Sequence, residues 1–154
     1  MSDVLTCLDY AASTPMRPEA VAAMAPFLIE SFGNPSGGHA GARAAKNALE
    51  EAREVVAECL GAQPGEVVFT GGGTESDNLA VLGAARAARA AGSGDGVVTT
   101  QLEHKGVLAP SDRLGREGFR VARVAVTGGG VVDLDAIADS LDDRTVVVSV
   151  MLVN

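Results

Sequence analysis

Beyond residue 65, short apolar runs alternate with longer segments in which alanine and charged residues recur at helical spacing. The runs that predict strands are 66–70, 97–100, 119–126 and 145–153. The segments that predict helices are 74–91, 105–117 and 133–141. Strands that alternate with helices predict an α/β fold, a mainly parallel sheet with helices on both faces. The last run is almost wholly apolar, which favours a central strand.

Two further helices are predicted before this alternation begins. The first spans 18–29, with Pro18 at its first position, where proline is favoured. The second spans 40–60, carries an amphipathic pattern, and is followed by Gly61, a typical helix-terminating residue. A loop over 31–38 is predicted between them from its glycine, serine and proline content.

Composition places the chain among globular proteins. Of its 154 residues 47% are apolar, which is enough for a core, and the net charge is −8. An acidic chain argues against nucleic acid or an anionic membrane as a direct partner. We recognise neither a secretory signal nor an apolar run long enough to span a bilayer, and we therefore expect a soluble, cytoplasmic protein.

The two cysteines, Cys7 and Cys59, lie far apart and in no spacing typical of a metal site. We therefore expect no metal centre. Each cysteine is expected to be a small buried apolar residue, Cys59 above all, because it falls on the apolar stripe of the helix predicted over 40–60.

A glycine-rich turn between a predicted strand and a predicted helix is the first candidate site. Gly71, Gly72 and Gly73 precede Thr74, and free amides at a helix N-terminus favour an anion such as phosphate. Thr74 and Ser76 add hydroxyl donors. Ser76 stands where a dinucleotide-binding fingerprint needs glycine, and the Lys of a Walker loop is missing. A phosphate cup and a plain flexible turn remain equally good interpretations of the spacing.

His104 is the second candidate, because it follows a predicted strand at the edge where parallel sheets bind ligands. Its imidazole could stack on a flat ring or act as an acid or base. The plainer interpretation of His104, and of His39, is a capping or surface residue. We expect Glu103 and Lys105 to be exposed charges.

Five segments, taken together and in order, resemble the cysteine desulfurases, enzymes of the class V aminotransferase group that use pyridoxal 5′-phosphate (PLP). The segments are LDYAASTP at 8–15, FGNPSGGH at 32–39, EVVFTGGGTESDNLAV at 66–81, LEHKGVL at 102–108 and VVVSVMLVN at 146–154. The resemblance spans the chain. It departs from the family at Gly71-Gly72-Gly73, where Ser-Gly-Ala is usual, which keeps the backbone donors and loses one hydroxyl.

The resemblance implies a role for each candidate residue. Gly73 and Thr74 contact the PLP phosphate through their amides and the Thr74 hydroxyl. His104 stacks on the pyridine ring and takes part in proton transfer. Asn154 matches the first residue of the family's Asn pair, of which the second contacts the cofactor. In the same family, segments 9–14 and 34–39 line the substrate side of the cleft, partly through a dimer interface, although Asp9 alone favours a turn.

The resemblance also implies the fold and the domains. We expect the PLP-transferase-like large domain, incomplete and truncated at Asn154, over 18–154. Residues 1–17 are expected to be an N-terminal extended segment of the small domain. The whole protein is expected to be a cytoplasmic homodimer that converts L-cysteine to L-alanine plus an enzyme persulfide. The sulfur acceptor is expected to be an iron–sulfur scaffold or a tRNA-thiolation protein.

The catalytic lysine, the acidic partner of the pyridine nitrogen and the nucleophilic cysteine of the family have no counterpart here. The chain's lysines and cysteines match none of those positions; they are Lys46, Lys105, Cys7 and Cys59. We therefore expect this chain to be inactive alone. Two alternatives stay open: another class V PLP enzyme, such as a selenocysteine lyase or an aminotransferase, or a non-catalytic truncated relic or partner-binding module.

Overall fold

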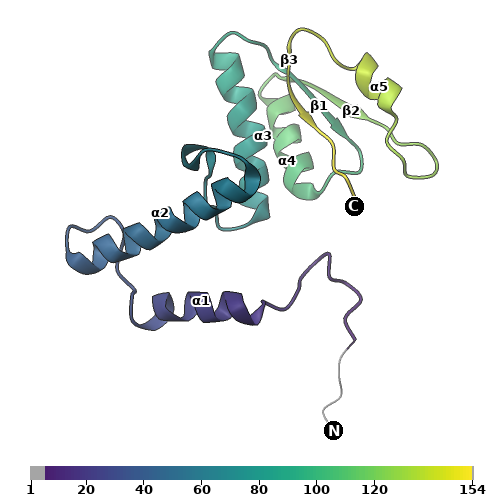
Figure 1. The fold of residues 1–154 in the computed structure, drawn as a ribbon. Helices are drawn as coiled ribbons and strands as arrows, with labels where there is room; N and C mark the ends of the chain where they lie inside the picture. Colours follow the sequence, from purple (N-terminus) through teal and green to yellow (C-terminus); the bar gives the residue numbers. More distant parts are fainter. Residues whose placement is uncertain (1–5, 154) are drawn as a thin grey trace. The chain divides into compact units, whose positions relative to one another are not determined.

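The computed structural model describes residues 6–153 (Figure 1). The chain separates into two compact units, Met1–Val68 and Phe69–Asn154. Assignment of 1–17 and 18–154 to two domains of a whole protein remains a prediction. Among the described residues, no helix combines the length and the apolar character needed to cross a membrane.

The first unit contains helix α1 (Pro18–Ile29), helix α2 (Ala40–Leu60) and a short 3₁₀ turn, η1 (Pro64–Glu66). Both helices confirm the sequence prediction. Gly61 ends α2 in the left-handed conformation, with a φ of 66°, and its N–H donates to carbonyl oxygens in the last turn. This is the glycine-terminated helix end that the sequence predicts.

The strand predicted over 66–70 is wrong. Pro64 begins η1 instead, and the Glu66 carboxylate accepts the backbone N–H of Gln63 at 2.7 Å, which closes a tight turn. The sheet of the described residues consists of three later strands, and 67–70 are not part of it. An apolar run needs a neighbouring strand to form a ladder, and a single sequence does not show whether one is available.

The burial predicted for the cysteines is also wrong. Cys7 and Cys59 are both exposed. On α2, Val55 and Leu60 share this exposure, at 59% and 71%, so much of the apolar stripe is uncovered. The pattern correctly predicts the helix, but burial requires a partner surface, and within this unit α2 packs mainly on the short turn η1.

The second unit carries the parallel sheet. Its elements are α3 (Gly73–Ala90), β1 (Gly96–Thr100), α4 (Lys105–Arg116), β2 (Arg120–Val124), α5 (Leu134–Asp139) and β3 (Thr145–Ser149). The strand order is β2-β1-β3, with both pairings parallel. This confirms the α/β class. The strand expected over 145–153 stops at Ser149, and it is β1, buried at all five residues, that lies in the centre of the three.

The sheet topology explains where the helices lie. The step from β1 to β2 and the step from β2 to β3 run in opposite directions across the sheet. Right-handed crossovers then place α4 and α5 on opposite faces, in agreement with the arrangement of this unit in Figure 1. Helices α3 and α4 pack on each other and against the strands.

The core lies between α3, α4 and β1. It is a cluster of six buried side chains, Val81, Ala85, Val97, Val107, Leu114 and Phe119. Leu114 is fully buried, and the guanidinium of Arg89 lies 3.2 Å from the centre of the Phe119 ring. Since this core fixes α3 against α4, it also fixes the N-terminal ends of the two helices relative to each other.

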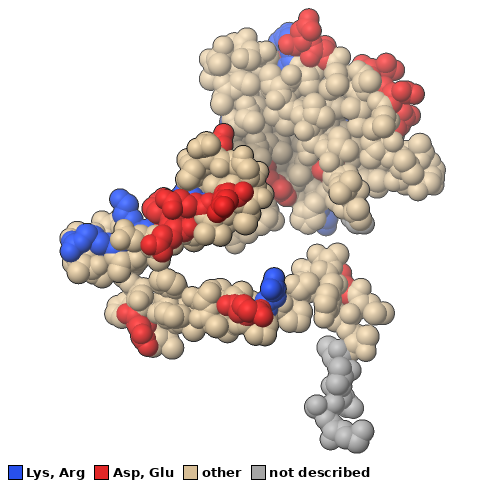
Figure 2. Space-filling view, viewed as in Figure 1, with Lys and Arg blue, Asp and Glu red and all other residues tan. Residues whose placement is uncertain are grey.

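Ion pairs join the far ends of the same helices. Glu117 accepts from Arg86 on α3 at 2.7 Å and from Arg113 on α4 at 2.6 Å. These bonds, that from Arg86 first, lower the pKa of Glu117 to about 2. On the face drawn in Figure 2, acidic side chains gather in patches over α2 and near α5, and lysine and arginine side chains form smaller groups.

Candidate cofactor-binding site at the ends of two helices

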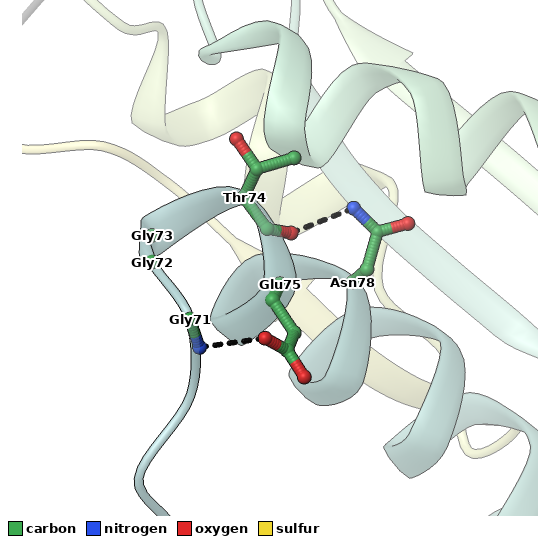
Figure 3. A pocket seen from close by; sticks show the side chains of 6 residues that line it. All are labelled: Gly71, Gly72, Gly73, Thr74, Glu75 and Asn78. Atoms are coloured by element: carbon green, nitrogen blue, oxygen red, sulfur yellow. Dashed lines mark hydrogen bonds between the residues drawn. The ribbon is translucent and has the colours of Figure 1, made fainter.

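The turn Gly71–Gly73 leads directly into α3. Gly72 has a φ of 158°, a conformation that side chains rarely adopt, and no side chain caps the helix. The first-turn N–H groups of a helix have no acceptor within it. A Cβ added at Gly72 or Gly73 would meet no atom within 4 Å, so the space in front of these donors is open (Figure 3). An oxyanion can therefore approach the helix end closely.

Two hydroxyl groups hold the turn in shape. The Oγ atoms of Thr70 and Ser76 lie 2.6 Å apart, and they lie 3.1 and 3.3 Å from the Gly72 carbonyl oxygen. The Ser76 hydroxyl, expected as a ligand donor, is thus turned toward the loop backbone. By contrast, no hydrogen bond within 6–153 engages the hydroxyl of Thr74, which leaves it available to a ligand.

Glu75 shows that this turn accepts a negative oxygen. Its Oε2 accepts the backbone N–H of Gly71 at 2.6 Å (Figure 3). A carboxylate is favoured there because the helix N-terminus carries partial positive charge. The sequence signal was present, a glutamate three residues after the helix N-cap, as in a capping box. Our sequence analysis missed it.

Asn78 links the first turn of α3 to the first turn of α4. Its Nδ2 donates to the Thr74 carbonyl at 2.8 Å and lies 3.5 Å from the Gly106 carbonyl. Asp77 also lies close to Gly106. A Cβ built on Gly106 would be 2.5 Å from Asp77 Oδ2 and 3.1 Å from His104 Nδ1. The structure therefore brings the helix ends of Thr74 and His104 together. Sequence reasoning missed Asn78, although it stands one helical turn after Thr74.

His104 caps α4. Its Nδ1 accepts the backbone N–H of Gly106 at 3.0 Å, and its side chain is exposed. Since Nδ1 is an acceptor, the neutral ring carries its proton on Nε2. His39 caps α2 in the same way, through Ala42 at 3.3 Å. The capping interpretation is confirmed for both histidines, and the exposed ring of His104 is free to meet a ligand as well.

Glu103 corrects an expectation. It is buried, at 6% exposure, whereas its neighbour Lys105 is exposed as expected. Its carboxylate accepts three hydrogen bonds, from Thr100, Ser149 and the backbone of Met151. The donors at 149 and 151 are distant in sequence, so a local pattern could not reveal this burial.

The remaining sequence-predicted residues lie elsewhere. Asn154 falls outside the described residues. In the other unit, the Asp9 carbonyl accepts the N–H of Ala12 at 3.2 Å, which confirms a turn, and Asn34 accepts the N–H of Ser36 at 3.0 Å. Their place on a substrate cleft stays a prediction. No cluster of three or more His, Cys, Asp or Glu within 6–153 is arranged to hold a metal ion.

Comparison with known proteins identifies the family. Residues 6–154 match the family model of class V aminotransferases. A cysteine desulfurase IscS of Dictyoglomus turgidum is 44% identical over 147 residues, which are 96% of this chain and 37% of that protein. One from Neisseria meningitidis serogroup C is 43% identical over 148 residues, with 96% and 36% covered.

Solved structures give the same result. A NifS-like protein superposes with a TM-score of 0.84 at 35% identity, over 93% of this chain and 39% of that one. DndA from Streptomyces lividans superposes with a TM-score of 0.79 at 34% identity, over 97% and 41%. The chain thus spans little more than a third of the length of its curated relatives. Within that span, the family match covers nearly every residue, and the chain belongs to the class V aminotransferase family.

Proposed function

We propose that the full-length protein produced by the cell is a PLP-dependent cysteine desulfurase. The observation that carries the proposal is the open glycine turn at the start of α3, joined through Asn78 to the helix that His104 caps. The relatives named cysteine desulfurase support the choice within the family. The present chain contributes the cofactor cradle.

Gly73 and Thr74 hold the phosphate of PLP in this proposal. Their N–H groups lie in the first turn of α3, where the helix supplies no acceptor. The Thr74 hydroxyl adds a donor, and Gly72 and Gly73 leave the approach open. The Glu75 carboxylate accepts the Gly71 N–H and so holds the loop against the first turn of α3. The N–H groups of Gly73 and Thr74 are left to the phosphate.

His104 stacks on the pyridine ring of PLP and moves protons during the reaction. The bond from Gly106 to Nδ1 fixes the tautomer, so Nε2 is the atom that gives and regains the proton. The exposed imidazole can therefore stack on a flat ring and exchange a proton through Nε2.

The overall reaction removes sulfur from L-cysteine. PLP, when bound, supplies an electron sink for bond breaking in the substrate. The C–S bond breaks, a cysteine thiolate of the enzyme takes the sulfur as a persulfide, and protonation at carbon gives L-alanine. That thiolate and the lysine that anchors PLP belong to no residue of this chain, since Cys7, Cys59, Lys46 and Lys105 match neither position. This chain alone is therefore inactive.

The proposal includes the setting of the reaction. The whole protein works in the cytoplasm as a homodimer, and the persulfide passes to an iron–sulfur scaffold or a tRNA-thiolation protein. The relatives named cysteine desulfurase IscS support a role in sulfur transfer. The chain's net charge of −8 does not suit direct nucleic-acid binding, which favours a protein as the sulfur acceptor.

Replacing Thr74 with valine tests the phosphate site. Thr74→Val removes the free hydroxyl but keeps the shape, and we expect PLP affinity to fall about tenfold, as for loss of one hydrogen bond to a charged group. Titration of the visible absorbance of PLP measures this. Thr6→Val, at an exposed threonine in the other unit, is the matched control. Equal PLP affinity in wild type and Thr74→Val would remove Thr74 from the site.

A sulfide assay tests the reaction itself. We incubate the 154-residue chain with PLP and L-cysteine, with and without a supplied C-terminal part, and measure sulfide. Sulfide only with the C-terminal part supports the proposal, whereas sulfide from the chain alone contradicts its inactivity. The intact mass of the cellular protein decides which length the enzyme has.

A further inference from the structure

Glu103 stands where β1 gives way to α4, and it is buried at 6% exposure. Its Oε1 accepts the Met151 N–H at 2.6 Å and the Thr100 hydroxyl at 3.1 Å. Its Oε2 accepts the Ser149 hydroxyl at 3.2 Å. Both carboxylate oxygens are therefore used, and every donor is neutral.

These donors come from separate segments of the chain. Thr100 is the last residue of β1 and Ser149 the last of β3, while Met151 lies in the segment that follows β3. Glu103 also directly precedes His104, the N-cap of α4. A single carboxylate thus ties the carboxyl ends of two strands to the start of the helix that presents the imidazole.

Packing alone does not explain a carboxylate at this position. Burying a charge costs free energy unless hydrogen bonds compensate for it, and no basic side chain in 6–153 forms an ion pair with Glu103. An apolar side chain of similar size would fill the same space at least as well. The carboxylate adds directional hydrogen bonds. Three donors on separate segments fix the position of its oxygen atoms.

We infer that Glu103 is a positioning residue for the cofactor site. It keeps His104 at a fixed separation from Met151 in the segment after β3, so that the imidazole stays aligned with the bound pyridine ring. The inference rests on the proposed function, since it assumes that His104 meets PLP. It adds a residue that itself touches neither PLP nor substrate.

Two variants at Glu103 separate the effect of its hydrogen bonds from the effect of its side-chain volume. Both are made in the full-length protein that the cell produces. Glu103→Leu keeps the volume and removes both acceptors. Glu103→Gln keeps an acceptor for Met151 and Thr100 and can donate to Ser149. It should therefore keep all three connections, which we call the Glu103 brace. Ser149→Ala removes one donor without altering the carboxylate. Asp139→Asn, at an exposed acid on α5, is the matched control.

The first readout is amide hydrogen exchange. The inference predicts faster exchange in Glu103→Leu at the Met151 N–H, which reports on the brace, and at the Gly106 N–H, which reports on His104. The buried β1 amide of Val98 should keep its rate, because the sheet remains folded. Uniform acceleration that includes Val98, or acceleration confined to Met151, overturns the inference.

The second readout is PLP binding, followed by its visible absorbance. We expect Glu103→Leu to weaken PLP affinity about tenfold and to shift the absorbance maximum, with Ser149→Ala intermediate and Glu103→Gln within about threefold of wild type. Wild-type affinity and spectrum in Glu103→Leu overturn the inference alone. A wild-type protein that does not bind PLP overturns the proposed function, and the role of Glu103 with it.

Discussion

At the scale of single residues, Gly94 shows how closely two turns of the sheet-bearing unit approach each other. Its φ is 152°, and a Cβ there would overlap the carbonyl oxygen of Arg144. That carbonyl cannot withdraw, because it accepts the N–H groups of Asp95 and Gly96 at 3.1 and 2.8 Å. The contact joins the turn before β1 to the turn before β3.

Replacing Gly94 with alanine should therefore destabilise this unit. We expect Gly94→Ala to lower the free energy of unfolding by about 1–3 kcal/mol, from overpacking together with an unfavourable φ. Urea denaturation measures the change. Gly128→Ala is the matched control, since a Cβ there meets nothing within 4 Å, and it should stay within about 0.5 kcal/mol of wild type. Equal stabilities of the two variants would contradict the steric argument.

Residue roles could be predicted from the sequence where they depend on neighbours in the chain. The glycine turn, the capping by His104 and the end of α2 at Gly61 all rest on local geometry. Glu103 could not be predicted, because its burial depends on donors at 149 and 151. Asn78 was missed for a similar reason, since it reaches across to Gly106.

At the scale of elements, Glu117 provides a pH-dependent link between α3 and α4. Its ordinary pKa of 4.5 falls to about 2, chiefly through the bond from Arg86. A lowered pKa means that the folded state favours the charged form. The stabilisation is present above the ordinary pKa and is lost as pH falls through the folded one.

We therefore expect the effect of Glu117→Gln on stability to depend on pH. The variant should be less stable than wild type near neutral pH, and the difference should shrink between about pH 4.5 and about pH 2. Urea denaturation across this range measures it. Asp139→Asn, at an acid that forms no ion pair within 6–153, should follow the wild-type pH curve. A difference that does not vary with pH would count against the ion pair.

Element prediction succeeded where periodicity was long. Helix α2 runs over the predicted residues, because many turns repeat the same pattern. Helix α1 also does so, and its start follows from Pro18 at the first helical position. Short apolar runs were less informative. The run at 66–70 forms no strand and the run at 145–153 forms a strand only to Ser149, because ladder formation depends on a neighbour.

At the scale of the whole molecule, the 154-residue chain should self-associate through β3. This strand lies at an edge of the three-stranded sheet. Val148 in the strand is 51% exposed, and Val150, just after its end, is 43% exposed. Apolar edges invite pairing with another chain. Sedimentation velocity should show concentration-dependent assembly, which Val148→Lys should reduce.

The control for this prediction is Val131→Lys, at a valine 64% exposed in a turn outside the sheet. It should leave the assembly unchanged, because a turn offers no row of strand donors and acceptors. A monomer at every concentration, or equal effects of the two lysine variants, would rule out assembly through β3.

The strand order β2-β1-β3 has a consequence for synthesis on the ribosome. The central strand is made first, and its second neighbour begins at Thr145, 45 residues after Thr100 (145 − 100). At about 5–20 residues per second, that interval lasts about 2–9 s. In the later part of that interval, once Val124 has been made, the nascent chain can pair β1 with β2 alone. One side of β1 stays open to chaperones until translation delivers the strand that closes it.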